Sequence, residues 1–237
     1  MAVTGLEADK DKTREKKRIM TVTIDENNLR QQLVEHYQYA EKLGLNELAS
    51  GNLSVRLGDG MLISPSGASA DNISIDNIVR VSLAGDWQGD HKPSSEWRMH
   101  AGIYQLHEDA HAVVHTHSDN CVAVSCQLKP LPGFHYLVGE FGGSDVPCVP
   151  YSTFGTQQLA DDASAALTDR SACLLGKHGM ICRGKDIRVA LDLAHRLEIM
   201  CRQYILTCHL GQPELLTEAD WVEFFERMEA VSYGEFI

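Results

Sequence analysis

The hydrophobic positions along the chain repeat with two different periods. Leu29, Leu33 and Tyr37 follow one another at intervals of four residues, which predicts a helix with one buried face. Thr23–Glu26 has the spacing of a capping box and predicts where this helix begins, and Gly44 predicts where it ends. Elsewhere, segments that alternate between apolar and polar residues are typical of strands.

The order of these elements indicates the class of fold. Strands are predicted at residues 51–57, 61–63, 77–83, 112–116, 172–176 and 180–183. Further helices are predicted at 94–106, capped by Ser94 or Ser95, at 120–126, 156–168 and 186–210, and after the capping box of Thr217–Asp220. This order favours an α/β fold, a single layered domain over residues 21–237 with a central, mostly antiparallel or mixed sheet flanked by helices.

The first twenty residues differ in composition from the rest of the chain. Six of the 21 lysines and arginines lie before Met20, in a stretch with little apolar content. The stretch lacks the apolar segment of a secretory signal. We therefore expect residues 1–20 to be a disordered basic tail, or the product of a misassigned start with Met20 as the true initiator.

Composition excludes several classes of function. The formal net charge of −12 argues against a nucleic-acid partner, although a phosphorylated metabolite remains possible where local groups bind it. No apolar run is long enough for a membrane span. The seven cysteines form no C-x-x-C pair, which indicates small core residues in a reducing compartment rather than disulfides or a cysteine zinc site. We expect a cytoplasmic protein.

His115-Thr-His117 ends an apolar run and is the strongest candidate for chemistry. Side chains two residues apart on a strand project from the same face, so the two imidazoles lie together. With Glu96 upstream and His178 downstream, they match a zinc site that exchanges one ligand for substrate. The spacing alone leaves a structural role open, because H-x-H also occurs on half-buried strands. The helical segments and the chain length do not suit a cupin or a metal-dependent amidohydrolase.

Three short segments have the composition of an anion-binding cradle. Gly51-Asn52 and Ser66-Gly67 offer backbone amides with little steric bulk, and Ser94-Ser95 offers hydroxyls and amides at a predicted helix N-terminus. Each segment alone is also typical of an ordinary turn. Glu96 follows the serines directly, which would bring a carboxylate next to a bound phosphate.

Six motifs together resemble the class II aldolase/adducin family, in the same order along residues 25–235. They are Gly51–Arg56, Ser64–Gly67, Lys92–Glu96, His115–His117, Pro150–Thr156 and Lys177–Gly179. The resemblance implies an α/β fold with a central sheet, a zinc-dependent lyase, and a homotetramer with fourfold symmetry whose sites lie at subunit boundaries.

The resemblance also implies roles for individual residues. The family's ligands for one Zn²⁺ per subunit match His115, His117 and His178, with Glu96 in the fourth position and acting as the acid/base. The residues that match the substrate phosphate site are Gly51, Asn52, Ser66, Gly67, Ser94 and Ser95.

Two tyrosines complete the set of residues that the resemblance implies. Tyr136 matches a tyrosine that protonates the aldehyde oxygen from the neighbouring subunit, and Tyr233 matches a C-terminal tyrosine near the site. The remaining candidates are interpreted as packed or solvated residues; they are His100, His107, His111, His195, Trp221, Phe224 and Phe225.

The reaction implied by the resemblance is reversible aldol cleavage of a ketose 1-phosphate to dihydroxyacetone phosphate and an aldehyde. Related members epimerise pentulose 5-phosphates, act on methylthioribulose 1-phosphate as aldolase or dehydratase, or decarboxylate phosphorylated acids, and these reactions stay open. A non-enzymatic adducin-like scaffold is disfavoured because this chain keeps all three histidines and Glu96.

Overall fold

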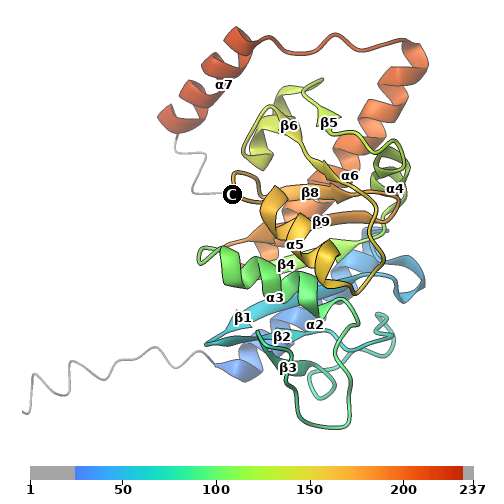
Figure 1. The fold of residues 1–237 in the computed structure, drawn as a ribbon, viewed down its shortest axis with the longest axis vertical. Helices are drawn as coiled ribbons and strands as arrows, with labels where there is room; N and C mark the ends of the chain where they lie inside the picture. The colour runs from blue at the N-terminus through green and yellow to red at the C-terminus, as the bar shows by residue number, and fades with distance from the viewer. Residues whose placement is uncertain (1–24, 232–237) are drawn as a thin grey trace, which may run out of the picture.

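The computed structural model describes residues 25–231 and has a seven-stranded sheet at its centre (Figure 1). The strand order is β3-β2-β1-β4-β9-β8-β7, and every neighbouring pair is antiparallel except β7 and β8. The strands are β1 (Asn52–Leu57), β2 (Gly60–Ile63), β3 (Val79–Ser82), β4 (Ala112–Thr116), β7 (Cys148–Val149), β8 (Ala172–Leu175) and β9 (Gly179–Gly184). The predicted mixed, mostly antiparallel sheet is confirmed.

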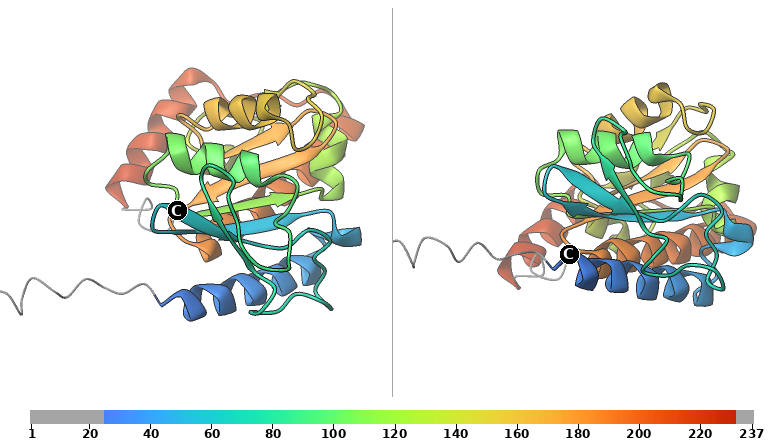
Figure 2. Two further views of the ribbon diagram at one scale, coloured as in Figure 1. Left: turned by 60° about the horizontal axis from the view of Figure 1, so that its bottom comes forward. Right: turned by 90° about the horizontal axis from the view of Figure 1, so that it is seen from below.

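Helices cover both faces of this sheet (Figure 2). One face carries α2 (Glu26–Lys42), α4 (Asp119–Ser125) and α6 (Ile187–Leu210), and the other carries α3 (Trp97–Leu106) and α5 (Gln157–Ala166). Alternation along the strands divides the core accordingly. On β4, Val114 packs with the α2 and α6 side, whereas Val113 packs with the α3 and α5 side. His115 has the same parity as Val113, so it faces α3.

Smaller elements extend the domain beyond the edge of the sheet. They are η1 (Glu47–Ala49), η2 (Tyr136–Phe141), the two-stranded sheet of β5 (Leu131–Pro132) and β6 (Asp145–Val146), and α7 (Glu218–Ala230). Helix α7 lies against η2, and its buried Trp221 joins the larger core cluster (Figure 1). Phe224 and Phe225 pack against the same cluster, which confirms their interpretation as packing residues.

Two helix starts differ from the prediction. The N-cap of α2 is Asp25, whose carboxylate accepts the N–H of Asn27 at 3.1 Å, whereas Thr23 lies outside the described residues. Helix α3 begins at Trp97, not at the serines. The Ser94 carbonyl accepts the Trp97 N–H at 3.1 Å, so Ser94 belongs to the turn before the helix and Glu96 takes the N-cap position. The capping box of Thr217 and Asp220 is confirmed.

The cysteines are all free thiols, and those at 121, 173, 182 and 201 are buried, as expected for small core residues. Within residues 25–231, no helix has the length and apolar content that a membrane crossing requires. The predicted tail (1–20) and Tyr233 lie outside the described residues.

Candidate active site

The register of the sheet brings three histidines to one place. His115 lies at the end of β4, His117 follows the last residue of that strand, and His178 lies in the turn between β8 and β9. Because Thr116 pairs with Met180, the β8–β9 turn lies beside the end of β4. Gly179 makes this approach possible, since a Cβ at that position would collide with the Thr116 carbonyl oxygen.

Glu96, at the start of α3, completes the cluster. Its Oε2 lies 3.0 Å from His115 Nε2, and its Oε1 lies 3.3 Å from His178 Nε2. The Nε2 atoms of His115 and His117 are 2.9 Å apart. One potential ligand atom from each of the four residues lies within 4.8 Å of all the others. The four predicted metal ligands therefore come together in space.

The cluster has the features of a metal-binding site. His115 Nδ1 lies 2.7 Å from the Met180 carbonyl oxygen, which can only accept, so Nδ1 donates there and Nε2 faces the other ligands. Glu96 Oε1 is buried without a hydrogen bond. A buried polar atom of this kind among three imidazoles fits a divalent cation in their midst.

The electrostatics of the cluster agree with this interpretation. Burial raises the pKa of Glu96, but the interactions with His115 and His178 outweigh burial and lower it, so the carboxylate is ionised. Burial lowers the pKa of His115, yet the facing Glu96 raises it overall. Burial, followed by the charges of His115 and His178, lowers the pKa of His117 to about 3. The buried carboxylate thus favours a positive charge among the imidazoles, whether a proton or a metal ion supplies it.

A chain of side-chain hydrogen bonds lies behind Glu96. Asn52 Nδ2 donates to Glu96 Oε2 at 2.9 Å, and Asn52 Oδ1 lies 2.5 Å from His100 Nε2. His100 Nδ1 lies 2.7 Å from Ser54 Oγ, which lies 2.8 Å from the Tyr104 hydroxyl oxygen. These contacts therefore connect the face of α3 that carries Glu96 with β1.

His100 is packed, as the sequence suggests, but its link to Glu96 through Asn52 was not predicted. A signal for it exists. Glu96, His100 and Tyr104 are spaced by four and share a helix face, while Asn52 and Ser54 are spaced by two and share a strand face. Neither spacing predicts that the two faces contact each other. That contact depends on how α3 packs over the sheet.

Two of the three segments predicted to bind phosphate lie side by side. The Ser66 N–H donates to the Lys92 carbonyl at 2.9 Å, and the Ser94 N–H donates to the Ser64 carbonyl at 3.1 Å. Ser66 and the neighbouring Gly67 are exposed, as is Ser95, whereas Ser94 is buried. Ser94 Oγ accepts the Glu96 N–H at 3.3 Å.

The third segment runs along the end of β4. A Cβ on Gly51 would lie 2.7 Å from the His115 carbonyl oxygen, so only glycine lets the chain pass here. The Asn52 side chain is engaged by Glu96 and His100, and its backbone pairs with His115 in the sheet, which leaves its second amide hydrogen for any phosphate.

The cluster opens into a cavity of about 360 Å³. Its walls contain Glu96, His117, His178 and Ser95, which have predicted roles. They also contain residues without a predicted role, namely Ser50, Tyr151, Ser152, Phe154 and Lys177. Tyr151 and Phe154 are more than half exposed and give the mouth of the cavity an apolar rim. Both lie in the Pro150–Thr156 motif, which was the available signal for them.

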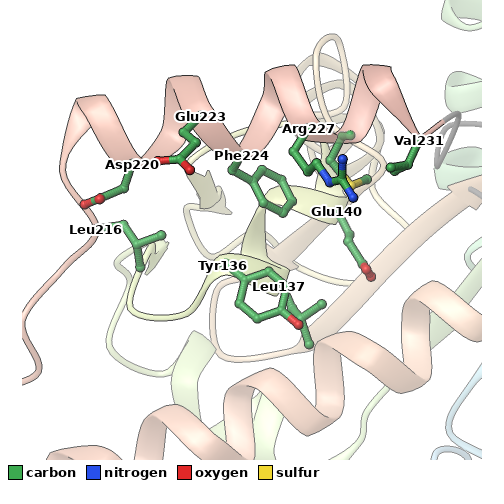
Figure 3. A pocket seen from close by; sticks show the side chains of 10 residues that line it. Tyr136, Leu137, Glu140, Leu216, Asp220, Glu223, Phe224, Arg227 and Val231 are labelled. Carbon is green, nitrogen blue, oxygen red and sulfur yellow. The ribbon is translucent and has the colours of Figure 1, made fainter.

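Tyr136 lies in a different cavity of about 450 Å³ (Figure 3). The lining of this cavity comes from η2 and from residues 216–231. The Tyr136 ring stacks on His135 with centroids 4.8 Å apart, and it is 53% exposed. Within one chain Tyr136 is thus not joined to Glu96, and its predicted role depends on a second subunit.

The sequence profile described as "Class II Aldolase and Adducin N-terminal domain" matches residues 31–205. The chain belongs to the class II aldolase and adducin family. The four-residue cluster, the cavity beside it and all six motifs lie within or at the ends of this match.

Known class II aldolases are similar to this chain over most of their length. A 5-methylthioribulose-1-phosphate/5-deoxyribulose-1-phosphate aldolase of Rhodospirillum rubrum is 41% identical over 207 residues, covering 87% of this chain and 93% of the relative. An L-fuculose phosphate aldolase of Escherichia coli is 40% identical over 190 residues, covering 80% and 88%. A solved structure named L-fuculose 1-phosphate aldolase superposes with a TM-score of 0.81 at 30% identity, covering 85% of this chain and 96% of that one. The protein is a class II aldolase, a carbon–carbon lyase, and the scaffold alternative is set aside.

Proposed function

We propose that this enzyme reversibly cleaves a ketose 1-phosphate to dihydroxyacetone phosphate and an aldehyde, with one Zn²⁺ per subunit held by His115, His117, His178 and Glu96. The observation that carries the proposal is the convergence of four ligand atoms within 4.8 Å, with Nδ1 of His115 engaged by the Met180 carbonyl. Three imidazoles with one exchangeable carboxylate are a donor set that suits zinc. When bound, the metal supplies Lewis acidity for the negative charge that cleavage creates on the substrate.

Proton transfers accompany the cleavage of the C3–C4 bond. The C4 hydroxyl loses its proton as the C4 carbonyl of the aldehyde forms, and the electron pair of the broken bond stays with C3. In the protein, Glu96 delivers a proton to C3, and it removes that proton in the direction of synthesis. Its place at the start of α3, held by Asn52 beside the histidines, supports this role.

The phosphate is assigned to the segments Gly51-Asn52, Ser66-Gly67 and Ser94-Ser95. The backbone bonds between residues 64–66 and 92–94 support the assignment, because they bring exposed Ser66, Gly67 and Ser95 onto neighbouring turns. Binding energy from the phosphate positions the ketose without touching the reacting bond.

The names of the relatives narrow the substrate. L-fuculose, 5-deoxyribulose and 5-methylthioribulose 1-phosphates all lack a terminal hydroxyl group. The exposed rings of Tyr151 and Phe154 at the cavity fit such an apolar terminus. We therefore infer that the aldehyde fragment ends in a methyl or methylthio group.

The decisive experiment is a substrate screen with zinc-loaded protein. These three ketose 1-phosphates should release dihydroxyacetone phosphate, and analogues with a terminal hydroxyl should react more slowly. Metal-free protein and His115→Ala serve as inactive controls. Epimerisation of a pentulose 5-phosphate without release of dihydroxyacetone phosphate would overturn the proposal, as would full activity in protein that elemental analysis shows to be metal-free.

Assembly and location are part of the same proposal. We infer a cytoplasmic homotetramer in which Tyr136 of one subunit acts at the site of another, and in which the C-terminal Tyr233 contributes near a site. The half-exposed ring of Tyr136, away from its own Glu96, supports a contribution to a neighbouring subunit.

A further inference from the structure

We propose that His100 is a positioning residue: it fixes the amide of Asn52 and thereby holds the Glu96 carboxylate in the metal centre. The proposal rests on the proposed function only in treating Glu96 as a metal ligand and proton-transfer group. It adds His100, which belongs neither to the four-residue cluster nor to the lining of the cavity beside it, and which acts on Glu96 through Asn52.

The first step is the orientation of the Asn52 amide. Glu96 Oε2 is 2.9 Å from Asn52 Nδ2. An ionised carboxylate can only accept hydrogen bonds, so the amide nitrogen must face Glu96. The amide oxygen is then turned towards His100, whose Nε2 lies 2.5 Å away. An oxygen in that place requires a donor on the imidazole.

The second step is the tautomer of His100. A neutral imidazole has one N–H, and Nε2 carries it because it donates to Asn52 Oδ1. Nδ1 is therefore an acceptor, and Ser54 Oγ donates to it across 2.7 Å. The Ser54 oxygen in turn accepts from the Tyr104 hydroxyl across 2.8 Å. All hydrogen bonds thus run in one direction, from Tyr104 to Glu96.

The third step is burial, which keeps water from replacing any hydrogen-bond partner in the chain from Tyr104 to Glu96. Ser54 and His100 are fully buried, Tyr104 is 1% exposed and Asn52 is 4% exposed. If the Asn52 amide turned over, its oxygen would face the Glu96 carboxylate and its NH₂ would face the His100 N–H. Both contacts are repulsive, so burial leaves a single arrangement of the chain. Arg56 secures the far end by donating to the Tyr104 carbonyl at 2.8 Å.

The oriented Asn52 amide acts on one oxygen of the Glu96 carboxylate, Oε2. Glu96 Oε2 is the atom that receives the Asn52 hydrogen bond and also lies 3.0 Å from His115 Nε2. Oε1 has no hydrogen bond of its own. Without the oriented amide, the carboxylate is free to rotate away from the imidazoles. Partners of metal ligands typically contribute about 10–100-fold to metal affinity or activity.

The test is a double-mutant cycle on zinc affinity, measured by competition with a chelator, in wild type, His100→Leu, Glu96→Ala and the double variant. If His100 acts through Glu96, His100→Leu raises the dissociation constant for zinc about 10–100-fold in the wild-type background. In the Glu96→Ala background the same substitution changes it by less than about twofold, because the group it positions is gone. If His100→Leu only disturbs the fold, it raises the dissociation constant for zinc equally in both backgrounds, and that result overturns the proposal. The proposal is also overturned if the dissociation constant does not rise in the wild-type background.

Two further variants separate positioning from damage to the helix. His100→Gln keeps an N–H donor towards Asn52 and should restore zinc affinity to within about threefold of wild type, well inside the 10–100-fold loss. His107→Leu is the matched control, because His107 is also buried and bonds the Ser164 carbonyl at 2.9 Å, but has no link to Glu96. It should leave zinc affinity unchanged. If His100→Leu does not fold, Tyr104→Phe replaces it in the cycle, because it removes the hydroxyl that donates to Ser54, and its loss of zinc affinity should likewise disappear in the Glu96→Ala background.

Turnover supplies an independent readout. His100→Leu should lower kcat on the reactive ketose 1-phosphate more than it raises KM, since the Asn52 side chain is the one part of the proposed phosphate segments that His100 contacts. Zinc-loaded wild type that cleaves none of the ketose 1-phosphates overturns the proposed function, but the cycle of zinc affinities still decides the role of His100. A rise in KM with unchanged kcat and zinc affinity would overturn the positioning role.

Discussion

The carboxylate of Glu198 accepts hydrogen bonds from Asn120 in the first turn of α4, the helix that follows the proposed metal ligand His117. The Asn120 backbone N–H donates to Oε1 at 3.1 Å and its side-chain amide donates to the same oxygen at 2.5 Å. The Cys121 N–H donates to Oε2 at 3.0 Å. Glu198 lies on α6 and Asn120 on α4, so this contact ties the end of β4 to the longest helix of the fold. It also compensates the unpaired N–H groups and the dipole at the start of α4.

Glu198→Gln should lower the free energy of unfolding at neutral pH by about 1.5–3 kcal/mol, the range for hydrogen bonds to a charged group. Burial raises the pKa of Glu198, but hydrogen bonds from Ser118, Asn120 and Cys121 outweigh the effect of burial, so the pKa is lowered overall. Because the pKa of Glu198 is lower in the folded state, its stabilisation of the fold is fully present above the unfolded-state pKa of about 4.3. It disappears as the pH falls through the folded-state pKa. Denaturant unfolding at several pH values checks this. The difference between the two proteins should narrow below about pH 4; a constant difference would contradict the assignment.

Glu96→Gln should keep the fold and the phosphate site but lose about 10²–10⁴-fold in turnover, the usual contribution of a general acid–base group. The amide has nearly the same volume but cannot carry the proton. The measurement is kcat on the reactive ketose 1-phosphate, with the exchange of the C3 hydrogen of dihydroxyacetone phosphate in D₂O followed by NMR. Near-normal exchange in the variant would rule out Glu96 as the proton-transfer group.

Gly179→Ala should displace the turn that carries His178. The added methyl group meets the Thr116 carbonyl, and overpacking of this kind costs about 1–3 kcal/mol. Zinc affinity should fall together with stability, because His178 precedes the displaced residue. Gly58→Ala is the control: Gly58 has φ +58° and open space around its Cβ position, so it should lose about 1–2 kcal/mol of backbone energy and keep full zinc affinity. Equal zinc affinities for both variants would contradict the role of Gly179.

A chain that starts at Met20 should unfold at the same temperature and turn over at the same rate as the full chain. The residues before Met20 concentrate charge and carry no hydrophobic period. Helix α2 has its own N-cap in Asp25. Thermal unfolding and kcat of the two chains provide the comparison. A marked loss in either property would show that the segment docks on the protein.

Mixing Tyr136→Phe chains with Glu96→Gln chains should restore activity that neither variant has alone. If the site is shared, some interfaces in a mixed tetramer combine an intact Glu96 with an intact Tyr136 from the next subunit. Activity is measured after denaturation and joint refolding, with differently tagged chains purified to prove mixing. Mixed tetramers that stay inactive, or a fully active monomer, would refute a shared site. The position of Tyr136 in a cavity next to α7, separate from the four ligands, motivates the test (Figure 3).

The sequence by itself determined the longer helices and strands and which residues are the candidates for chemistry. The four-residue spacing of α2, the alternation in β1 and the capping box of α7 follow from interactions between near neighbours, which local sequence specifies. The two-residue spacing of His115 and His117 likewise requires only strand geometry. Strands β5, β6 and β7 have two residues each and carry no period, so they were not predicted.

Only the tertiary structure decided which distant segments meet. The register of β4 with β9 brings His178 to His115, and the packing of α3 across the sheet joins Glu96 and His100 to Asn52 on β1. Likewise, Tyr136 lies apart from Glu96 because η2 packs against α7 rather than over the cavity. Such contacts span tens of residues, and their choice depends on burial and hydrogen bonding summed over the whole core. Local periodicity specifies the face on which a side chain lies, whereas packing of the whole domain decides what that face meets.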